Sequence, residues 1–127
     1  MSTILVIEDE PIVRNFVVQV LTRENYRVLE ADSAAEALDV SNQYESIDLV
    51  ITDHSLKTMT VPEVVAQLCR SRPHLKVLQM SGYPKEWLLR EGHLTEDIAF
   101  LPKPFVKASL LAADICRANR VRAGGSR

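Results

Sequence analysis

The sequence has few cysteines and histidines, and neither kind of residue is clustered. Two cysteines and three histidines occur among 127 residues, with no CxxC pair and no histidine near a cysteine. Cys69 and Cys116 fall far apart within helical patterns, where a packed thiol is favoured over redox chemistry. His54, His74 and His93 are equally scattered. This argues against a disulfide framework and against a zinc or copper site.

Charge of one sign and long apolar runs are also missing. Fifteen basic residues face 17 acidic ones, and the net charge of -2 gives no general attraction to nucleic acid or membrane. No apolar run approaches the length that a bilayer requires, and the chain enters an apolar run directly rather than through a signal peptide. We therefore expect a cytoplasmic protein without direct contact to nucleic acid or membrane.

Short apolar runs alternate with longer amphipathic stretches along the chain. Strands are expected at residues 3–7, 26–31, 47–52, 75–80 and 98–101, and helices from 11, over 34–41, from 62, after 84 and over 106–121. This alternation predicts an α/β fold, a flavodoxin-like doubly wound (βα)5 three-layer sandwich. The most apolar runs should be central and the polar second run at an edge, which favours strand order 2-1-3-4-5. Residues 1–121 would form one domain, and 122–127 a flexible tail.

Local signals support three of these helices. Ser33 and Glu36 have the spacing of a capping box at the start of the second helix. Apolar residues at helical spacing should face the core. In the first helix these are Val13, Phe16, Val17, Val20 and Leu21, and in the third they are Val64, Val65, Leu68 and Cys69.

Polar groups follow several of the expected strands. Glu8-Asp9, Asp53, Ser81 and Lys103 each come at or just after the end of an apolar run, and the carboxyl ends of parallel strands are where such sheets bind ligands. Any one of them alone could be a solvated loop residue. Together they predict a site in which three carboxylates need a divalent ion or Lys103 to offset their repulsion. Oxygen ligands suit Mg²⁺, and Asp53 is the best candidate for a nucleophile that forms an aspartyl phosphate.

At this point the chain resembles a known family. The segments VIEDEP, LVITD, MSG and LPKPF are together similar to the receiver domain of bacterial two-component response regulators, the CheY-like domains, over nearly the whole chain. The resemblance implies a signalling phosphoacceptor rather than an enzyme. A histidine kinase or a histidine phosphotransfer protein would pass a phosphoryl group from its phosphohistidine to this domain, with Mg²⁺ as the cofactor and Mn²⁺ as a substitute.

The resemblance also implies a role for each acid of the site. Asp53 would be the phosphoacceptor. Asp9 would bind the metal directly, together with Asp53 and the backbone carbonyl of Ser55. Glu8 would hold the metal through water, in a place where many relatives have aspartate.

A further set of residues would respond to the phosphoryl group. Lys103 would contact the phosphoryl oxygens, and Ser81 would donate a hydrogen bond to them. Phe100 matches an aromatic residue that turns inward on activation. The output surface would comprise residues 87–91, Phe100 and residues 106–116. Through it the domain would bind a downstream protein. The domain would be a monomer, or a weak dimer formed through the same surface.

The loop after Asp53 departs from the family pattern. Leu56-Lys57 and Met59-Thr60-Val61 stand where relatives usually have a Met-Pro pair and a Met-Asp-Gly. The proline and glycine that shape this loop are therefore missing, while the chemical groups of the site are complete. Lys57 either adds positive charge near the site or is a solvated loop lysine.

We expect a single-domain regulator without a DNA-binding output, and several alternatives stay open beside it. The chain could be the receiver segment of a hybrid histidine kinase, which its initial Met1 disfavours. A phosphatase with an aspartyl-phosphate intermediate usually needs a second acid two residues after the nucleophile. Ser55 stands there, so that alternative is weaker. A receiver that no longer accepts phosphate is disfavoured by the complete set of site groups.

Tyr83 lies two residues after Ser81 and generates a first prediction. An aromatic ring there could overhang the phosphorylated aspartate and obstruct the attacking water, although it could equally pack on the following helix. We predict slow loss of phosphate from Asp53 and a shorter phosphorylated lifetime in Tyr83→Ala, measured as decay of the labelled protein. A lifetime that is unchanged or longer in the variant would exclude this role.

Overall fold

The computed structural model describes residues 2–53, 61–82, 84–92 and 99–103. The strands are β1 (Thr3–Ile7), β2 (Arg27–Ala31), β3 (Leu49–Asp53), β4 (Lys76–Ser81) and β5 (Ala99–Pro102), and the helices are α1 (Pro11–Arg23), α2 (Ala34–Gln43), α3 (Val61–Ser71) and α4 (Lys85–Arg90). The helix expected over 106–121 and the tail at 122–127 lie outside the described residues. None of the described helices has the length and apolar character to cross a membrane.

The five strands form one parallel sheet in the order β2-β1-β3-β4-β5. β2 is at an edge, as its polar sequence predicts, and the central strands β1 and β3 are almost completely buried. Asp53 and Ser81 are the last residues of β3 and β4, one position earlier relative to the strand end than the sequence suggests. The predicted α/β fold class, a parallel sheet with alternating helices, is confirmed.

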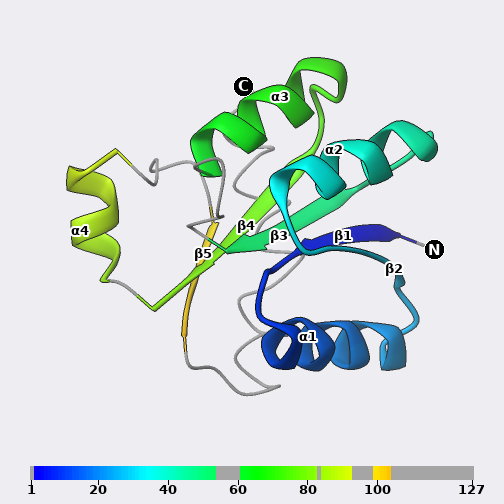
Figure 1. The fold of residues 1–127 in the computed structure, drawn as a ribbon, viewed down its shortest axis with the longest axis horizontal. Helices are drawn as coiled ribbons and strands as arrows, with labels where there is room; N and C mark the ends of the chain where they lie inside the picture. Colours follow the sequence, from blue (N-terminus) through cyan, green and yellow to red (C-terminus); the bar gives the residue numbers. More distant parts are fainter. Residues whose placement is uncertain (1, 54–60, 83, 93–98, 104–127) are drawn as a thin grey trace.

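Helices cover both faces of the sheet, so the core has two layers (Figure 1). α1 packs on one face, where Val17, Val20 and Leu21 meet side chains of β1, β3 and β4. α2 and α3 pack on the opposite face, where Ala37 and Leu68 meet the alternate residues of the same sheet. Because strand side chains alternate between faces, each central strand supplies both layers.

The apolar stripe of α1 is narrower than the sequence predicts. Val17, Val20 and Leu21 are buried and Val13 is half-buried, but Phe16 is 37% exposed. Successive helical residues are about 100° apart, so Phe16 lies on the flank of a stripe that is centred on Val17. In α3, Leu68 is buried and Cys69 is partly buried against the core, as expected. The predicted inner residues Val64 and Val65 have side chains outside the described part.

α2 begins with the predicted capping box. The Ser33 hydroxyl accepts a hydrogen bond from the backbone N–H of Glu36 at 3.1 Å. The Glu36 carboxylate in turn accepts from the N–H of Asp32 at 2.8 Å, one residue before the cap. The first bond satisfies an N–H group that a helix start leaves without a partner, whereas the second differs from the usual capping box, in which the Glu side chain accepts from the N–H of the cap residue itself.

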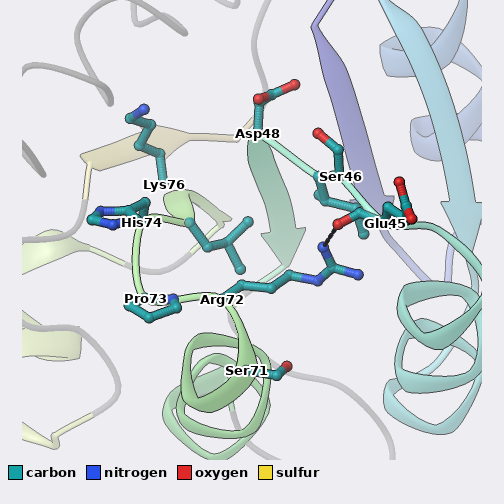
Figure 2. A pocket seen from close by; sticks show the side chains of 10 residues that line it. Glu45, Ser46, Asp48, Ser71, Arg72, Pro73, His74 and Lys76 are labelled. Atoms are coloured by element: carbon teal, nitrogen blue, oxygen red, sulfur yellow. Dashed lines mark hydrogen bonds between the residues drawn. The ribbon is translucent and has the colours of Figure 1, made fainter.

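Arg72 caps the other end of α2 from a distance in sequence. Its guanidinium donates to the carbonyls of Ser41, Tyr44 and Glu45 and to the Ser41 hydroxyl. A cation at the carboxyl end of a helix complements the helix dipole and the unpaired carbonyls there. Arg72 and Glu45 are among the residues that line a hollow of about 310 Å³ between the starts of β3 and β4 (Figure 2). The position of Arg72 in this hollow is explained by its hydrogen bonds to the backbone carbonyls at the end of α2.

Candidate functional site

Chain segments that are far apart in sequence converge at the carboxyl edge of the sheet. Glu8 follows β1, Asp53 ends β3, and Lys103 follows β5. The register pairs Ser81 with Pro102, and the N–H of Lys103 donates to the carbonyl of Ser81 at 2.7 Å. The end of β5 is thereby fixed to β4, which directs Lys103 toward the central strands.

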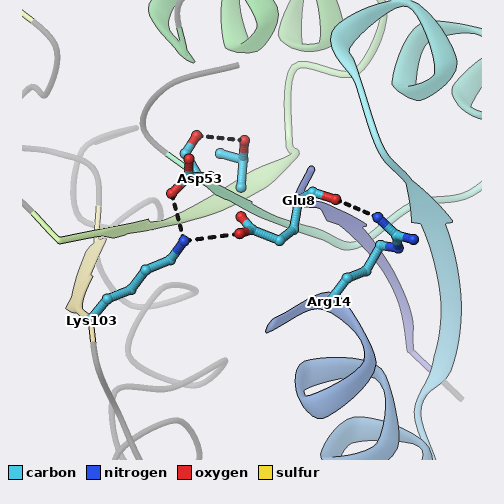
Figure 3. A network of polar contacts seen from close by, with 5 residues as sticks. Glu8, Arg14, Asp53 and Lys103 are labelled. Atoms are coloured by element: carbon cyan, nitrogen blue, oxygen red, sulfur yellow. Dashed lines mark hydrogen bonds and ion pairs between the residues drawn. The ribbon is translucent and has the colours of Figure 1, made fainter. Parts of the chain in front are cut away.

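Lys103 forms ion pairs with two acids (Figure 3). Its Nζ lies 2.9 Å from Oδ1 of Asp53 and 2.9 Å from Oε1 of Glu8. The side chain of Glu8 is 0% exposed, and those of Asp53 and Lys103 are largely buried. Charge-assisted hydrogen bonds in such a setting are shorter and stronger than neutral ones. One ammonium group thus links the ends of β1, β3 and β5.

Burial and charge act in opposite directions on these groups. For Glu8, loss of hydration on burial outweighs the hydrogen bond from Lys103, and the nearby charge of Asp53 adds to it, so the pKa rises from 4.5 to about 7. For Lys103, burial alone would lower the pKa, but the hydrogen bonds to Asp53 and Glu8 outweigh it and the pKa is raised. Lys103 is therefore a stable cation, whereas Glu8 is a poorly compensated acid.

A cluster of three carboxylates lies beside this ion pair. Ligand oxygens of Glu8, Asp9 and Glu10 lie within 4.8 Å of one another, just before the start of α1. Within the described part of the chain, Oε2 of Glu8 is buried without a hydrogen-bond partner. Hard oxygen donors and an unpartnered buried carboxylate oxygen fit a Mg²⁺ ion. Glu10 was not singled out from the sequence; its signal was the uninterrupted run Glu8-Asp9-Glu10.

The other predicted site residues are distributed as follows. Ser81 is buried at the end of β4, and Phe100 is half-buried in β5, opposite Gln79. Glu8, predicted to reach a metal through water, has its carboxylate on Lys103 in this structure. Ser55, Lys57 and Tyr83 lie outside the described residues.

Comparison with known proteins identifies the family to which this chain belongs. The fold is similar to that of the receiver domain from the hybrid histidine kinase CckA, with a TM-score of 0.75, 28% identity, and coverage of 93% of this chain and 99% of that one. The response regulator receiver domain family matches residues 4–114, so the chain belongs to this family. Receiver domains are signalling phosphoacceptors of two-component systems. They typically bind Mg²⁺ at an acidic cluster and interact with histidine kinases or phosphotransfer proteins.

Two curated relatives come from Brucella abortus. The sensor kinase CckA is 33% identical over 105 residues, which are 82% of this chain and 11% of the kinase. The response regulator receiver protein CpdR is 30% identical over 105 residues, which are 83% of this chain and 87% of CpdR. The chain therefore spans a small part of the first relative and most of the second.

The raised pKa of Glu8 generates a prediction about stability. Because the folded protein holds this proton more tightly than the unfolded chain, Glu8 contributes stability at low pH that is lost as the pH rises from about 4.5 to 7. In metal-free buffer we expect the free energy of unfolding to fall by up to about 3 kcal/mol over that interval from this group. Glu8→Gln should remove this decline, as measured by urea denaturation at several pH values.

The matched control is Glu10→Gln, which neutralises an exposed acid of the same cluster. It should keep the pH dependence of the unmodified protein. Parallel pH profiles for the protein and Glu8→Gln would contradict the prediction.

Proposed function

We propose that this chain accepts a phosphoryl group on Asp53 from a phosphohistidine and thereby switches a protein-binding surface. The observation that carries the proposal is the Lys103 bridge, with Nζ 2.9 Å from both Asp53 and Glu8, beside a cluster of carboxylates. A strand-end carboxylate held by a cation at a ligand-binding edge has the features of an activated acceptor.

The transfer would proceed by attack of an Asp53 carboxylate oxygen on phosphorus. A new P–O bond forms while the P–N bond to the donor imidazole breaks, and the imidazole nitrogen keeps the electron pair. Lys103 is close enough to Asp53 to move its contact onto the incoming phosphoryl oxygens. This transfers its positive charge to where negative charge accumulates.

The residues that would hold Mg²⁺ are Asp9, Asp53 and Glu8, with the backbone carbonyl of Ser55 as implied by the family. Glu10 would join them from the adjoining position in the cluster. When bound, the ion would neutralise phosphoryl oxygens and orient them for transfer. Mn²⁺ would be a substitute because it accepts the same oxygen ligands.

The switch would involve Ser81 and Phe100. Ser81 lies at the end of β4, next to the Lys103 backbone. Its hydroxyl would donate a hydrogen bond to a phosphoryl group on Asp53. Phe100 is half-buried in β5, which is separated from β1 by β3 and β4. Its inward movement would change the surface formed by α4, β5 and residues 106–116, through which we propose that a partner protein or a second copy binds.

The similarity to the CckA receiver favours a second possibility for the protein to which this domain belongs. There the domain would be a segment of a hybrid histidine kinase, whereas the similarity to CpdR over most of its length favours a single-domain regulator. An immunoblot of the native polypeptide decides between the two, since a single-domain regulator would migrate near 14.3 kDa.

Asp53→Asn tests the proposed acceptor directly. Incubation with acetyl phosphate and Mg²⁺ should add one phosphoryl group to the protein and none to the variant, measured by intact mass. Asp39→Asn, which changes an exposed aspartate of α2, is the control and should be labelled normally. Labelling of Asp53→Asn, or labelling that persists in chelator, would contradict the proposal.

The start of α1 would provide the contact for the phosphohistidine donor. Ile12 is 84% exposed and Phe16 37% exposed, and we call these two residues the α1 apolar patch. The patch begins two residues after the acidic cluster. A protein that brings a phosphohistidine to Asp53 must cover the surface around the site, so it would bury this patch.

Ile12→Asp should therefore slow phosphoryl transfer from a protein donor without slowing transfer from a small-molecule donor. Burial of an isoleucine side chain contributes about 2 kcal/mol, so transfer from a phosphorylated kinase or phosphotransfer protein should slow at least about tenfold. Labelling by acetyl phosphate should be unchanged. Gln19→Asp places the same charge two turns along α1 and is the control. Equal slowing with both donors would show an effect on the site itself.

A further inference from the structure

Arg14 connects the acidic cluster to the edge strand. It lies in the first turns of α1, and its Nη1 donates to the backbone carbonyl of Glu8 at 2.8 Å. Its Nε lies 3.5 Å from Oε1 of Glu30 in β2. The Arg14 side chain is 19% exposed, so most of it is packed rather than extended into solvent.

The Glu8 backbone is consequently fixed on both sides. Its N–H donates to the carbonyl of Ala31 at 3.0 Å, and its carbonyl accepts from Arg14, whose other partner is the residue before Ala31. The carbonyl of Glu8 shares a rigid peptide plane with the N–H of Asp9. Fixing that carbonyl fixes the direction in which the chain enters Asp9, and with it the origin of the Asp9 side chain.

This contact lies where repulsion would otherwise open the loop. Three carboxylates within 4.8 Å of one another repel when ionised. Figure 3 shows Lys103 and Arg14 on opposite sides of Glu8, with Lys103 at its carboxylate and Arg14 at its backbone carbonyl. Lys103 partly neutralises the Glu8 carboxylate, whereas Arg14 holds the Glu8 backbone through its carbonyl.

We propose that Arg14 is a positioning residue for the cation site. By holding the Glu8–Asp9 peptide through a two-point contact to Glu8 and Glu30, it keeps the cluster carboxylates converged before the cation arrives. The proposal rests on the proposed function in one respect, namely that this cluster binds Mg²⁺.

The sign of the effect separates positioning from simple charge. Arg14 is a positive group near a cation site, so as a charge alone it would repel Mg²⁺, and its removal would tighten binding. As a positioning residue it lowers the cost of assembling the ligands, and its removal would weaken binding. The two roles therefore predict opposite changes in Mg²⁺ affinity.

The experiment is a calorimetric titration of Mg²⁺ into the full chain and its variants, with Mn²⁺ binding followed by electron paramagnetic resonance. Arg14→Met should weaken Mg²⁺ binding about tenfold, the value expected for a lost hydrogen bond from a charged donor. Arg14→Lys should remain weakened, because a single ammonium lacks the planar fork that reaches both partners. Arg23→Met, in the last turn of α1, should bind Mg²⁺ normally.

Glu30→Asp provides a second variant that keeps Arg14 in place and leaves the charge unchanged, while it shortens the side chain that contacts Arg14. Glu30 is 49% exposed, so the change should be tolerated by the fold, and a loss of about threefold in Mg²⁺ affinity is expected because one of two anchors is weakened. If Arg14→Met does not fold, this variant decides. Unchanged or tighter Mg²⁺ binding in folded Arg14→Met, or unchanged binding in Glu30→Asp, would overturn the positioning role. Absence of Mg²⁺ binding and of Asp53 labelling in the unmodified protein would instead refute the proposed function.

Discussion

The ion pair of Lys103 with Glu8 and Asp53 is the interaction on which the carboxyl edge of the sheet depends. Its ammonium group lies 2.9 Å from each carboxylate and so joins residues at the ends of three strands. Removing one partner of such a pair leaves a buried charge without compensation, which is far costlier than losing a surface ion pair. Lys103 does not fully compensate Glu8, because burial still raises its pKa to about 7. The carboxyl edge is thus held together by charge, while the Glu8 carboxylate remains incompletely neutralised.

The sheet makes these ion pairs possible because it places the carboxyl ends of the strands side by side. β1 and β3 are neighbours although 41 residues separate Ile7 from the start of β3 at Leu49, and the chain between them covers β2 and two helices. At the opposite end of the sheet, the Arg72 guanidinium donates hydrogen bonds to the end of α2 and to the loop after it. The end of the sheet near Arg72 is therefore fixed by hydrogen bonds to backbone carbonyls. At the carboxyl edge, by contrast, the polar side chains contact one another and form the candidate site.

Much of this site could be predicted because strand ends are visible in a sequence. Asp53 and Lys103 follow apolar runs, and a parallel sheet brings such positions together. The sequence indicates that Lys103 could offset the site carboxylates, but it does not tell which of them Lys103 contacts, because sequence places the backbone and does not select a rotamer. Arg14 was missed for a related reason: its partner is a carbonyl group, which every residue has, so no pattern of residue types marks the contact. Phe16 was misplaced because helical spacing does not fix the centre of the buried stripe.

The sharing of Lys103 between two acids connects these observations. Lys103 has one ammonium group, and in this structure it is shared between Glu8 and Asp53. A phosphoryl group on Asp53 would carry more negative charge than the carboxylate it replaces and would draw Lys103 toward itself. Glu8 would then lose its hydrogen-bond partner while remaining buried, a state that a divalent cation beside Asp9 could relieve. Phosphoryl transfer and cation binding would therefore favour each other through Glu8, with Arg14 holding the backbone that both depend on.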